Sequence, residues 1–250
     1  MARILVTGAA TGLGLDAASA LVDAGHDVVV HARDLARLAD ALDTAGASRW
    51  QGVLTGDLAD PGGIRDVARQ AGEFGRFDAV IHNAGVYRAP GKDILAVNVL
   101  APYALTCLMH EPQRLIYLGS GEHWQGDPAL ARTLAGKRSI DYADSKLFVL
   151  LFAKAFARRW PDAYVNVVDP GWVPTKMGGR NAPDDLGKGV ETQAWLAVSG
   201  DRAARVSGRY FHHRKEADYQ AAADDTTVQE ALLTACERIT GVAPPSARVL

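Results

Sequence analysis

The sequence predicts an α/β protein in which helices cover both faces of a doubly wound, mostly parallel β-sheet. Short apolar runs rich in Val, Ile and Leu alternate along the chain with helical patterns of roughly 12 to 15 residues. A glycine-rich loop joins the first apolar run to the first helical pattern. Because two parallel strands need a long crossover between them, this alternation indicates a parallel sheet rather than a set of hairpins.

Length and composition fit one globular domain, which we assign to residues 1–250. Hydrophobic residues make up 48% of the chain and charged residues 22%, so a disordered chain is not expected. The formal net charge is −2 and the arginines are scattered, which disfavours nucleic acid and anionic membranes as partners.

The sequence lacks the signals of a membrane span, a secretory leader or a metal site. No apolar stretch approaches the roughly 18 residues that a span requires, and residues 1–6 lead into a glycine loop as a strand would. Cys107 and Cys236 are far apart and belong to no CxxC or Cys/His spacing. We therefore expect a cytoplasmic protein without a bound metal.

The first strand and the first helix enclose a loop suited to a phosphate ligand. Residues 3–6 form the predicted strand, and Gly8, Gly12 and Gly14 follow it in a TGxxxGxG pattern. Glycines let the backbone approach a pyrophosphate, and the free amides at a helix start stabilise its charge. Such a loop is by itself often only a turn, but its place between strand and helix favours nucleotide binding.

The second predicted strand, residues 26–31, bears on the choice of cofactor. In a dinucleotide-binding unit, the residue that closes this strand faces the adenosine ribose, and a carboxylate there accepts from the 2′-hydroxyl. Ala32 stands at this place and Arg33 follows, which favours the 2′-phosphate of NADP(H) over NAD(H). The alternative is an Arg33–Asp34 surface pair at the start of a helix predicted over 34–45.

Two further predicted strands end in small or polar residues. Residues 51–54 are followed by Gly56-Asp57-Leu58, and residues 77–82 are followed by Asn83-Ala84-Gly85. Ligands of parallel sheets bind at the carboxyl ends of the strands. We therefore expect these two segments and Gly8 to line one crevice.

The second half of the chain continues the alternation. A helix is predicted over 95–109 with Asn98 among apolar neighbours, and a strand over 114–118 is followed by Ser120. Residues 122–139 show no periodic pattern and are expected to form a loop, a sixth strand is predicted over 164–168, and His212 and His213 are expected to lie in a later strand.

The helix predicted from Tyr142 brings two functional groups to one face. Tyr142 and Lys146 are four residues apart, a little over one helical turn. An ammonium about 4 Å from a phenolate attracts it by roughly 4 kcal/mol at an effective dielectric of about 20, which predicts a lowered pKa for Tyr142. Such a phenol serves as a general acid or base. The alternative is an ordinary amphipathic helix with an exposed tyrosine and lysine at this spacing.

Together these motifs resemble those of the short-chain dehydrogenases/reductases. The motifs, in the order and near the spacings of that family, are TGxxxGxG at residues 7–14, Asn83-Ala84-Gly85, Asn98, Ser120, YxxxK at 142–146, and Pro170-Gly171 through Thr175. The match spans residues 3 to about 212. Each motif is weak by itself, but six motifs in the order and near the spacings of the family make a strong match. The 22-residue step from Ser120 to Tyr142 is similar to the retinol dehydrogenase and carbonyl reductase branch. Gly119 departs from the family, which often has a second serine there.

The resemblance implies a single-domain Rossmann fold and four catalytic residues. Tyr142 would transfer a proton to or from the substrate oxygen, and Ser120 would hydrogen-bond that oxygen. Lys146 would lower the Tyr142 pKa and bind the nicotinamide ribose, while Asn98 would hold a water that links Lys146 to solvent. The residues implied at the cofactor are Gly8, Thr11, Gly12, Leu13, Gly14, Arg33, Asp57, Leu58, Asn83, Ala84, Gly85, Tyr142, Lys146, Pro170, Gly171, Val173 and Thr175, the last at the carboxamide.

We therefore expect an oxidoreductase that transfers a hydride between NADP(H) and a small carbonyl or alcohol substrate, with reduction of a ketone or aldehyde as the main hypothesis. One alternative is an NADP-binding sensor or regulatory protein without turnover, which the complete set of catalytic residues disfavours. The other is an NAD-dependent alcohol dehydrogenase of the same fold, which Arg33 disfavours.

Composition alone suggests which segments shape the substrate site. Residues 176–187, rich in Gly, Pro and Asp, are expected to form a mobile lid, and 213–250 a C-terminal extension with a helix over 222–239. Side chains expected at the substrate mouth, or else packed structurally, are Trp172, Met177, Trp124 and His123. His212 and His213 are adjacent in a predicted strand, so their side chains should point to opposite faces and make a poor joint metal site.

The helix after Tyr142 also bears on oligomeric state. Phe148, Leu151, Phe152 and Phe156 lie on more than one of its faces. A helix that is apolar beyond one stripe must be buried on several sides. A homodimer through this helix would bury it, and so would coverage by residues 122–139.

Overall fold

A central eight-stranded sheet organises the computed structural model, which describes residues 1–37, 49–134 and 139–246. The strands lie in the order β3-β2-β1-β4-β5-β6-β7-β8; all are parallel except β8, which pairs antiparallel with β7. Their bounds are β1 (Arg3–Val6), β2 (Asp27–Ala32), β3 (Gly52–Thr55), β4 (Ala79–His82), β5 (Arg114–Leu118), β6 (Tyr164–Asp169), β7 (Arg209–His212) and β8 (Lys215–Glu216). The order reverses beside β1, as in a doubly wound sheet, which confirms the predicted fold class.

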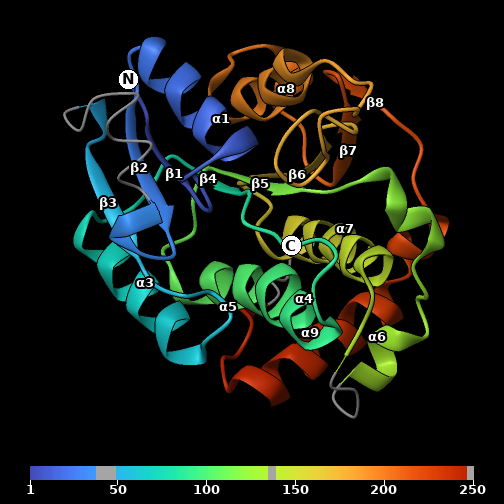
Figure 1. Ribbon diagram of the computed structural model, residues 1–250. Coiled ribbons are helices and arrows are strands. Elements are labelled where there is room, and N and C mark those ends of the chain that lie inside the picture. The colour runs from blue at the N-terminus through green and yellow to red at the C-terminus, as the bar shows by residue number, and fades with distance from the viewer. Residues whose placement is uncertain (38–48, 135–138, 247–250) are drawn as a thin grey trace.

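Helices cover both faces of this sheet (Figure 1). On one face lie α1 (Gly12–Asp23) and α8 (Leu186–Val198), and on the other α3 (Pro61–Glu73), α5 (Ala101–Leu108) and α7 (Tyr142–Arg159). Side chains alternate along each strand, so Ile4 packs toward α1 and α8 while Leu5 packs toward the opposite layer. Outside α7 lies α9 (Thr226–Thr240).

The helix predicted over 95–109 is interrupted. The structure has α4 (Gly91–Ile94), a π-helical segment η2 (Leu95–Leu100), and then α5. Asn98 lies buried within η2, and a π-helical turn is a common feature of functional sites. Pro102 lies in the first turn of α5, directly after η2, and has no backbone N–H to donate.

The loop expected over 122–139 and the helix expected over 222–239 both need correction. The first contains a 3₁₀ helix, η3 (Gly121–Gln125), and α6 (Leu130–Thr133), which are too short for periodicity to reveal. The second splits into η6 (Ala221–Asp224) and α9, because the Asp225 carboxylate caps a new helix by accepting from Thr227 N at 2.8 Å. Another short 3₁₀ turn is η5 (Arg202–Ala204). Most of the helix predicted over 34–45 lies outside the described residues.

The start of α7 is fixed by a capping box. The Asp141 side chain accepts from Asp144 N at 2.8 Å, and the Asp144 side chain accepts from Asp141 N at 3.2 Å. Tyr142 is therefore the first residue of the helix. Its phenol projects from the end of α7 nearest to the carboxyl edge of the sheet.

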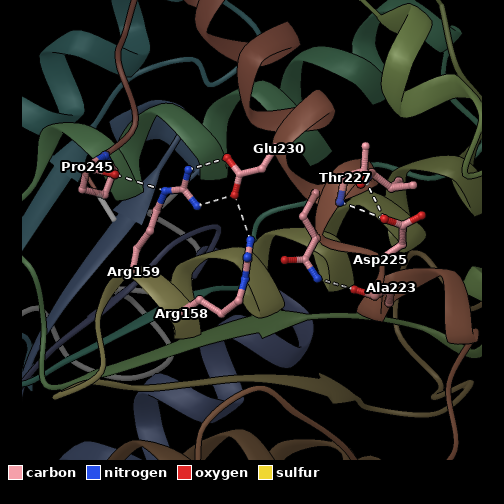
Figure 2. Close-up of polar contacts among 9 residues, drawn as sticks. Arg158, Arg159, Ala223, Asp225, Thr227, Glu230 and Pro245 are labelled. Atoms are coloured by element: carbon pink, nitrogen blue, oxygen red, sulfur yellow. Dashed lines mark hydrogen bonds and ion pairs between the residues drawn. The ribbon is translucent and has the colours of Figure 1, made fainter. Parts of the chain in front are cut away.

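Ion pairs tie the other end of α7 to α9 (Figure 2). Arg159 donates two hydrogen bonds to the Glu230 carboxylate, at 2.9 and 2.6 Å, and one from Nε to Pro245 O at 3.1 Å. Arg158 reaches the same carboxylate at 2.8 Å. Because Arg159 is only 7% exposed, this bidentate pair is stronger than an ordinary surface ion pair.

The apolar faces of α7 are covered inside the chain itself. Phe148, Phe152 and Phe156 are fully buried between the sheet and the surrounding helices, α9 among them. Burial of this helix thus no longer requires a second subunit, and a homodimer stays a prediction. Within the described ranges, no helix is both long and apolar enough to cross a membrane.

Candidate active site

Strand ends meet where the sheet order reverses, between β1 and β4. The Asn83 side-chain amide donates to Thr7 O at 2.9 Å and to Gly8 O at 3.1 Å. In return, the Thr7 hydroxyl accepts from the backbone N–H groups of Asn83 and Ala84, both at 3.1 Å. These bonds hold the glycine loop and the segment after β4 together as one wall of the site.

The glycines of the loop are required by close approach and by backbone conformation. Gly8 has a φ of +66°, and a Cβ there would lie 2.7 Å from the Ala84 Cα. A Cβ at Gly14 would clash with the Asn83 amide. Helix α1 then begins at Gly12 with no capping side chain and no acidic residue in its first turn. Its free amides suit an anion, so this loop fits the pyrophosphate of a dinucleotide.

His31 supports this loop from below, a role that the sequence reasoning missed. Its Nδ1 accepts from Gly8 N at 3.2 Å, so the ring proton lies on Nε2 and is donated to Gly56 O at 3.0 Å. Burial lowers the pKa of His31 and keeps the ring neutral. A polar residue inside an otherwise apolar strand was the available signal.

The loop after β6 closes over the start of α1. A Cβ on Gly12 would contact the Thr175 methyl at 3.5 Å, so these two predicted cofactor residues face each other. Leu13 and Val173 both lie against Gly189 of α8, since a Cβ on that glycine would be 3.2 Å from each. Pro170 and Gly171 begin this loop, and the Asp169 carboxylate accepts from Gly171 N at 2.9 Å.

The residues predicted at the adenosine end lie at the ends of β2 and β3. Ala32 pairs with Thr55 in register, which brings Arg33 beside the segment that begins at Gly56. The Arg33 side chain is 51% exposed and pairs with Asp34 at 3.4 Å, as the surface-pair alternative expected. Such an exposed pair contributes little energy, which leaves the guanidinium available to another anion. Asp57 is exposed and Leu58 buried, both directly after β3.

The phenol of Tyr142, the hydroxyl of Ser120 and the ammonium of Lys146 gather at the carboxyl end of β5. The Ser120 hydroxyl lies close enough to the Tyr142 phenol to lower the pKa of Tyr142. Lys146 Nζ lies 5.3 Å from the Tyr142 ring centroid and donates to Leu118 O at 2.8 Å. The first turn of α7 thus faces the end of β5.

The expected lowering of the Tyr142 pKa is wrong for this structure. Burial raises the pKa of Tyr142, and the Asp169 and Glu122 carboxylates raise it further. The Lys146 ammonium sits beside the ring and is bonded to a carbonyl, so its attraction does not offset these effects. Burial lowers the pKa of Lys146 itself to about 8. At neutral pH the phenol is therefore protonated and most of the lysine is charged.

Asn98 connects η2 to the two neighbouring segments. Its Oδ1 accepts from Val86 N at 2.8 Å, and its Nδ2 donates to Val86 O at 3.0 Å and to Ser145 Oγ at 3.1 Å. The segment after β4 is thereby fastened to α7 next to Lys146. The water relay expected at Asn98 stays a prediction.

The structure bears on two expectations for histidines. Of the two alternatives for His123, the substrate mouth or structural packing, the structure shows packing, since the side chain is 1% exposed and the chain after β8 covers it. His212 and His213 were expected on opposite faces, yet their ring centroids are 3.8 Å apart. The strand ends at His212, and His213 and Arg214 form a turn with φ values of 47° and 62°, so strand alternation no longer applies.

Four large apolar side chains are exposed in the segments that follow β4, β5 and β6. Tyr87 packs edge-on against Tyr142 with ring centroids 4.8 Å apart and is 40% exposed. Trp124, Trp172 and Met177 are 53%, 60% and 46% exposed. Large apolar groups left exposed on segments at the carboxyl edge of the sheet are typical of a binding surface.

Comparison with known proteins agrees with this fold. A family model described as short chain dehydrogenase matches residues 2–108. An oxidoreductase of Emericella nidulans, AN7799, is 39% identical and covers 98% of this chain and 99% of its own length. The short-chain dehydrogenase chry4 of Gibberella zeae is also 39% identical, over 98% of this chain and 100% of its own. Human retinol dehydrogenase 13 is 30% identical, over 98% of this chain and 86% of its own.

Solved structures share the same architecture. An uncharacterised protein from Mycobacterium paratuberculosis superimposes with a TM-score of 0.80 at 23% identity, covering 98% of this chain and 96% of its own. The RhlG/NADP complex of Pseudomonas aeruginosa gives a TM-score of 0.68 at 22% identity, over 84% of this chain and 94% of its own.

Fold, site and relatives define an oxidoreductase with a Rossmann fold. The chain belongs to the short-chain dehydrogenase/reductase family. The predicted similarity to retinol dehydrogenases is confirmed by the human sequence and its mouse relatives.

The buried ammonium generates a prediction about pH. The pKa of Lys146 is 10.5 in an unfolded chain and about 8 in the folded protein, so between these values the unfolded chain binds the extra proton. The Lys146 contribution to the free energy of unfolding should therefore rise with pH, by up to roughly 3 kcal/mol between pH 7 and 10.5. Urea unfolding of wild type and Lys146→Met at pH 7 and pH 10 measures the difference.

The control is Lys92→Met, which removes an exposed lysine from α4. Relative to Lys146→Met, wild type should gain stability at the higher pH, whereas Lys92→Met should follow wild type. A wild-type to Lys146→Met difference that is the same at both pH values would show that the ammonium is not desolvated.

Proposed function

We propose that this protein reduces a ketone or aldehyde to an alcohol with NADPH. The observation that carries the proposal is the protonated phenol of Tyr142 beside the Ser120 hydroxyl. Both groups can donate a hydrogen bond to a single carbonyl oxygen, and a phenol that is protonated at neutral pH is ready to give up a proton.

The residues of the chain then have distinct tasks. Bound at the glycine loop, NADPH supplies the hydride that the carbonyl carbon receives. As negative charge develops on the carbonyl oxygen, Ser120 stabilises it by hydrogen bonding and Tyr142 transfers its proton to it. The Lys146 ammonium, 5.3 Å from the centre of the Tyr142 ring, would stabilise the resulting phenolate by charge attraction.

The support for NADP(H) comes from Arg33. Its half-exposed guanidinium lies where β2 ends, beside the end of β3, and its pairing with Asp34 is weak. Structural neighbours from Pseudomonas aeruginosa and Burkholderia cenocepacia were crystallised with NADP. The residues proposed at the cofactor remain those named from the sequence, with His31 added beneath the glycine loop.

The substrate side is proposed from exposed apolar groups. Tyr87, Trp124, Trp172 and Met177 would contact the apolar part of the substrate, and residues 176–187 would act as its lid. Cys107 and Cys236 are both free thiols, which supports the proposed cytoplasmic location.

The first test is Tyr142→Phe. The ring still packs against Tyr87, but no proton can be transferred, so kcat should fall about 10² to 10⁴-fold while the Kd for NADPH changes little. Steady-state NADPH consumption with a panel of ketones, aldehydes and quinones, and fluorescence titration of NADPH, measure the two quantities. The matched control is Tyr164→Phe, because Tyr164 begins β6 and therefore lies at the edge of the sheet away from the site. A Tyr142→Phe variant with kcat within a few-fold of wild type would refute the mechanism.

The second test concerns cofactor choice. A charge-assisted contact with the 2′-phosphate contributes roughly 1.5 to 3 kcal/mol, so Arg33→Ala should lower kcat/KM for NADPH by about 10- to 150-fold and leave NADH nearly unaffected. Ala32→Asp should shift the preference further, because a carboxylate accepts from the ribose hydroxyl and repels the phosphate.

Arg69→Ala, which removes an exposed arginine from α3, serves as the control for lost surface charge. Equal use of NADH and NADPH by wild type would contradict the NADP(H) assignment. So would an Arg33→Ala variant that weakens both cofactors alike, because Arg33 would then serve only Asp34 and its other neighbours.

A further inference from the structure

We propose that the chain after β8, which we call the C-terminal arm (residues 217–246), positions Ser120 through Gln220 and His123. Both are positioning residues that act through the backbone of the serine and touch no substrate. The inference rests on the proposed function, in which Ser120 and Tyr142 hold one substrate oxygen.

Gln220 fastens the arm to the 3₁₀ helix that follows Ser120. Its side-chain amide nitrogen lies within hydrogen-bonding distance of three backbone carbonyls, those of His123 at 3.1 Å, Trp124 at 3.1 Å and Gly126 at 3.0 Å, which share its two hydrogens. Three acceptors around one nitrogen fix the orientation of the amide. Its backbone N–H also donates to His123 Nε2 at 3.2 Å. One residue of the arm thus contacts the His123 ring and three carbonyls in or next to η3.

His123 passes this contact to Ser120. Because its Nε2 accepts from Gln220, the proton of the neutral ring lies on Nδ1, which is 2.7 Å from Ser120 O and donates to it. The ring is 1% exposed and packs against Tyr210, with centroids 4.8 Å apart. The backbone amide of Gln220 and the imidazole of His123, both rigid and planar, therefore connect the arm to the Ser120 carbonyl.

The same arm is anchored on α7, which carries Tyr142 and Lys146. Lys154 pairs with Asp224 at 2.9 Å, and Arg159 pairs with Glu230 in the bidentate contact of Figure 2. Within the arm, the Gln229 side chain donates to Ala223 O at 2.6 Å and keeps η6 against α9. The arm therefore fixes the serine turn relative to the helix that bears the phenol.

The C-terminal arm therefore controls the distance between the Ser120 hydroxyl and the Tyr142 phenol. A carbonyl oxygen accepts from both Ser120 and Tyr142 only if their separation stays within hydrogen-bonding limits, and a displacement of about 1 Å can cost 10²-fold in rate. Loss of the three Gln220 side-chain contacts should therefore lower kcat, while cofactor binding, which rests mainly on the glycine loop and the adenosine end, should change little.

Gln220→Leu tests the arm, and Gln125→Leu is its matched control, because Gln125 lies exposed on the same 3₁₀ helix. Hydrogen exchange followed by mass spectrometry should show faster exchange over residues 119–127 in Gln220→Leu only, with residues 142–159 unchanged. In the same variant kcat should fall about 10- to 100-fold, with the Kd for NADPH within 3-fold of wild type.

Substitutions of His123 separate positioning from packing. His123→Asn keeps a donor at the place of Nδ1 and should retain kcat within about 3-fold, whereas His123→Phe keeps the aromatic packing but loses the donor and should lose at least 10-fold. A role in packing alone predicts the opposite order, with Phe tolerated better than Asn, and that order would overturn the proposal.

The exchange measurement judges the arm independently of turnover. Unchanged exchange over residues 119–127 in Gln220→Leu would overturn the proposal, whether or not wild type consumes NADPH. Faster exchange with an unchanged kcat would also overturn it, because the serine would then need no positioning. Wild-type protein that consumes no NADPH with any carbonyl would contradict the proposed function instead. Faster exchange over residues 119–127 in Gln220→Leu than in wild type would then still support the link from the arm to the serine turn.

Discussion

A buried ammonium determines how the rest of this site must be built. Lys146 is 7% exposed, its charge is disfavoured by burial, and the hydrogen bond to Leu118 O joins α7 to the end of β5. A helix that carries such a group must be held firmly, or it would move to let water in. The capping box at Asp141, the Asn98 bond to Ser145 and the Arg159–Glu230 pair hold it at its start, along its first turn and at its end.

Two buried histidines support the two loops of the site in the same way. His31 accepts from Gly8 N and donates to Gly56 O beneath the glycine loop, while His123 accepts from Gln220 N and donates to Ser120 O beneath the serine turn. Burial lowers the pKa of both rings, so each keeps one donor and one acceptor at neutral pH. A protonated ring would present a second donor to a backbone N–H and would break the contact. Neutral imidazole thus gives both loops a fixed orientation without adding charge near the ligand.

The sequence was informative where local patterns decide the structure and silent where distant contacts do. Strand and helix alternation predicted the sheet, and the ends of β1, β4 and β5 carried Gly8, Asn83 and Ser120 to one edge because parallel strands end together. The burial of His123 depends on Gln220, which is 97 residues away in sequence, and no periodicity reveals such a partner. The Tyr142 pKa was predicted in the wrong direction for a related reason, since spacing shows that Lys146 is near but not how much water is excluded or where Asp169 lies. The π-helical turn at Asn98 and the turn at His213 are likewise set by tertiary contacts and strand length.

In the proposed reaction, a hydride moves from NADPH to a carbonyl carbon and the protein supplies the proton. The most direct measurement is to incubate the enzyme in ordinary water with a ketone or aldehyde that it consumes and with NADPH deuterated at one or the other face of nicotinamide C4. The account predicts one deuterium on the carbinol carbon from one labelled face only, because the cofactor is held in a single orientation. An alcohol without deuterium from either face, or no alcohol from any carbonyl in the panel, would contradict it.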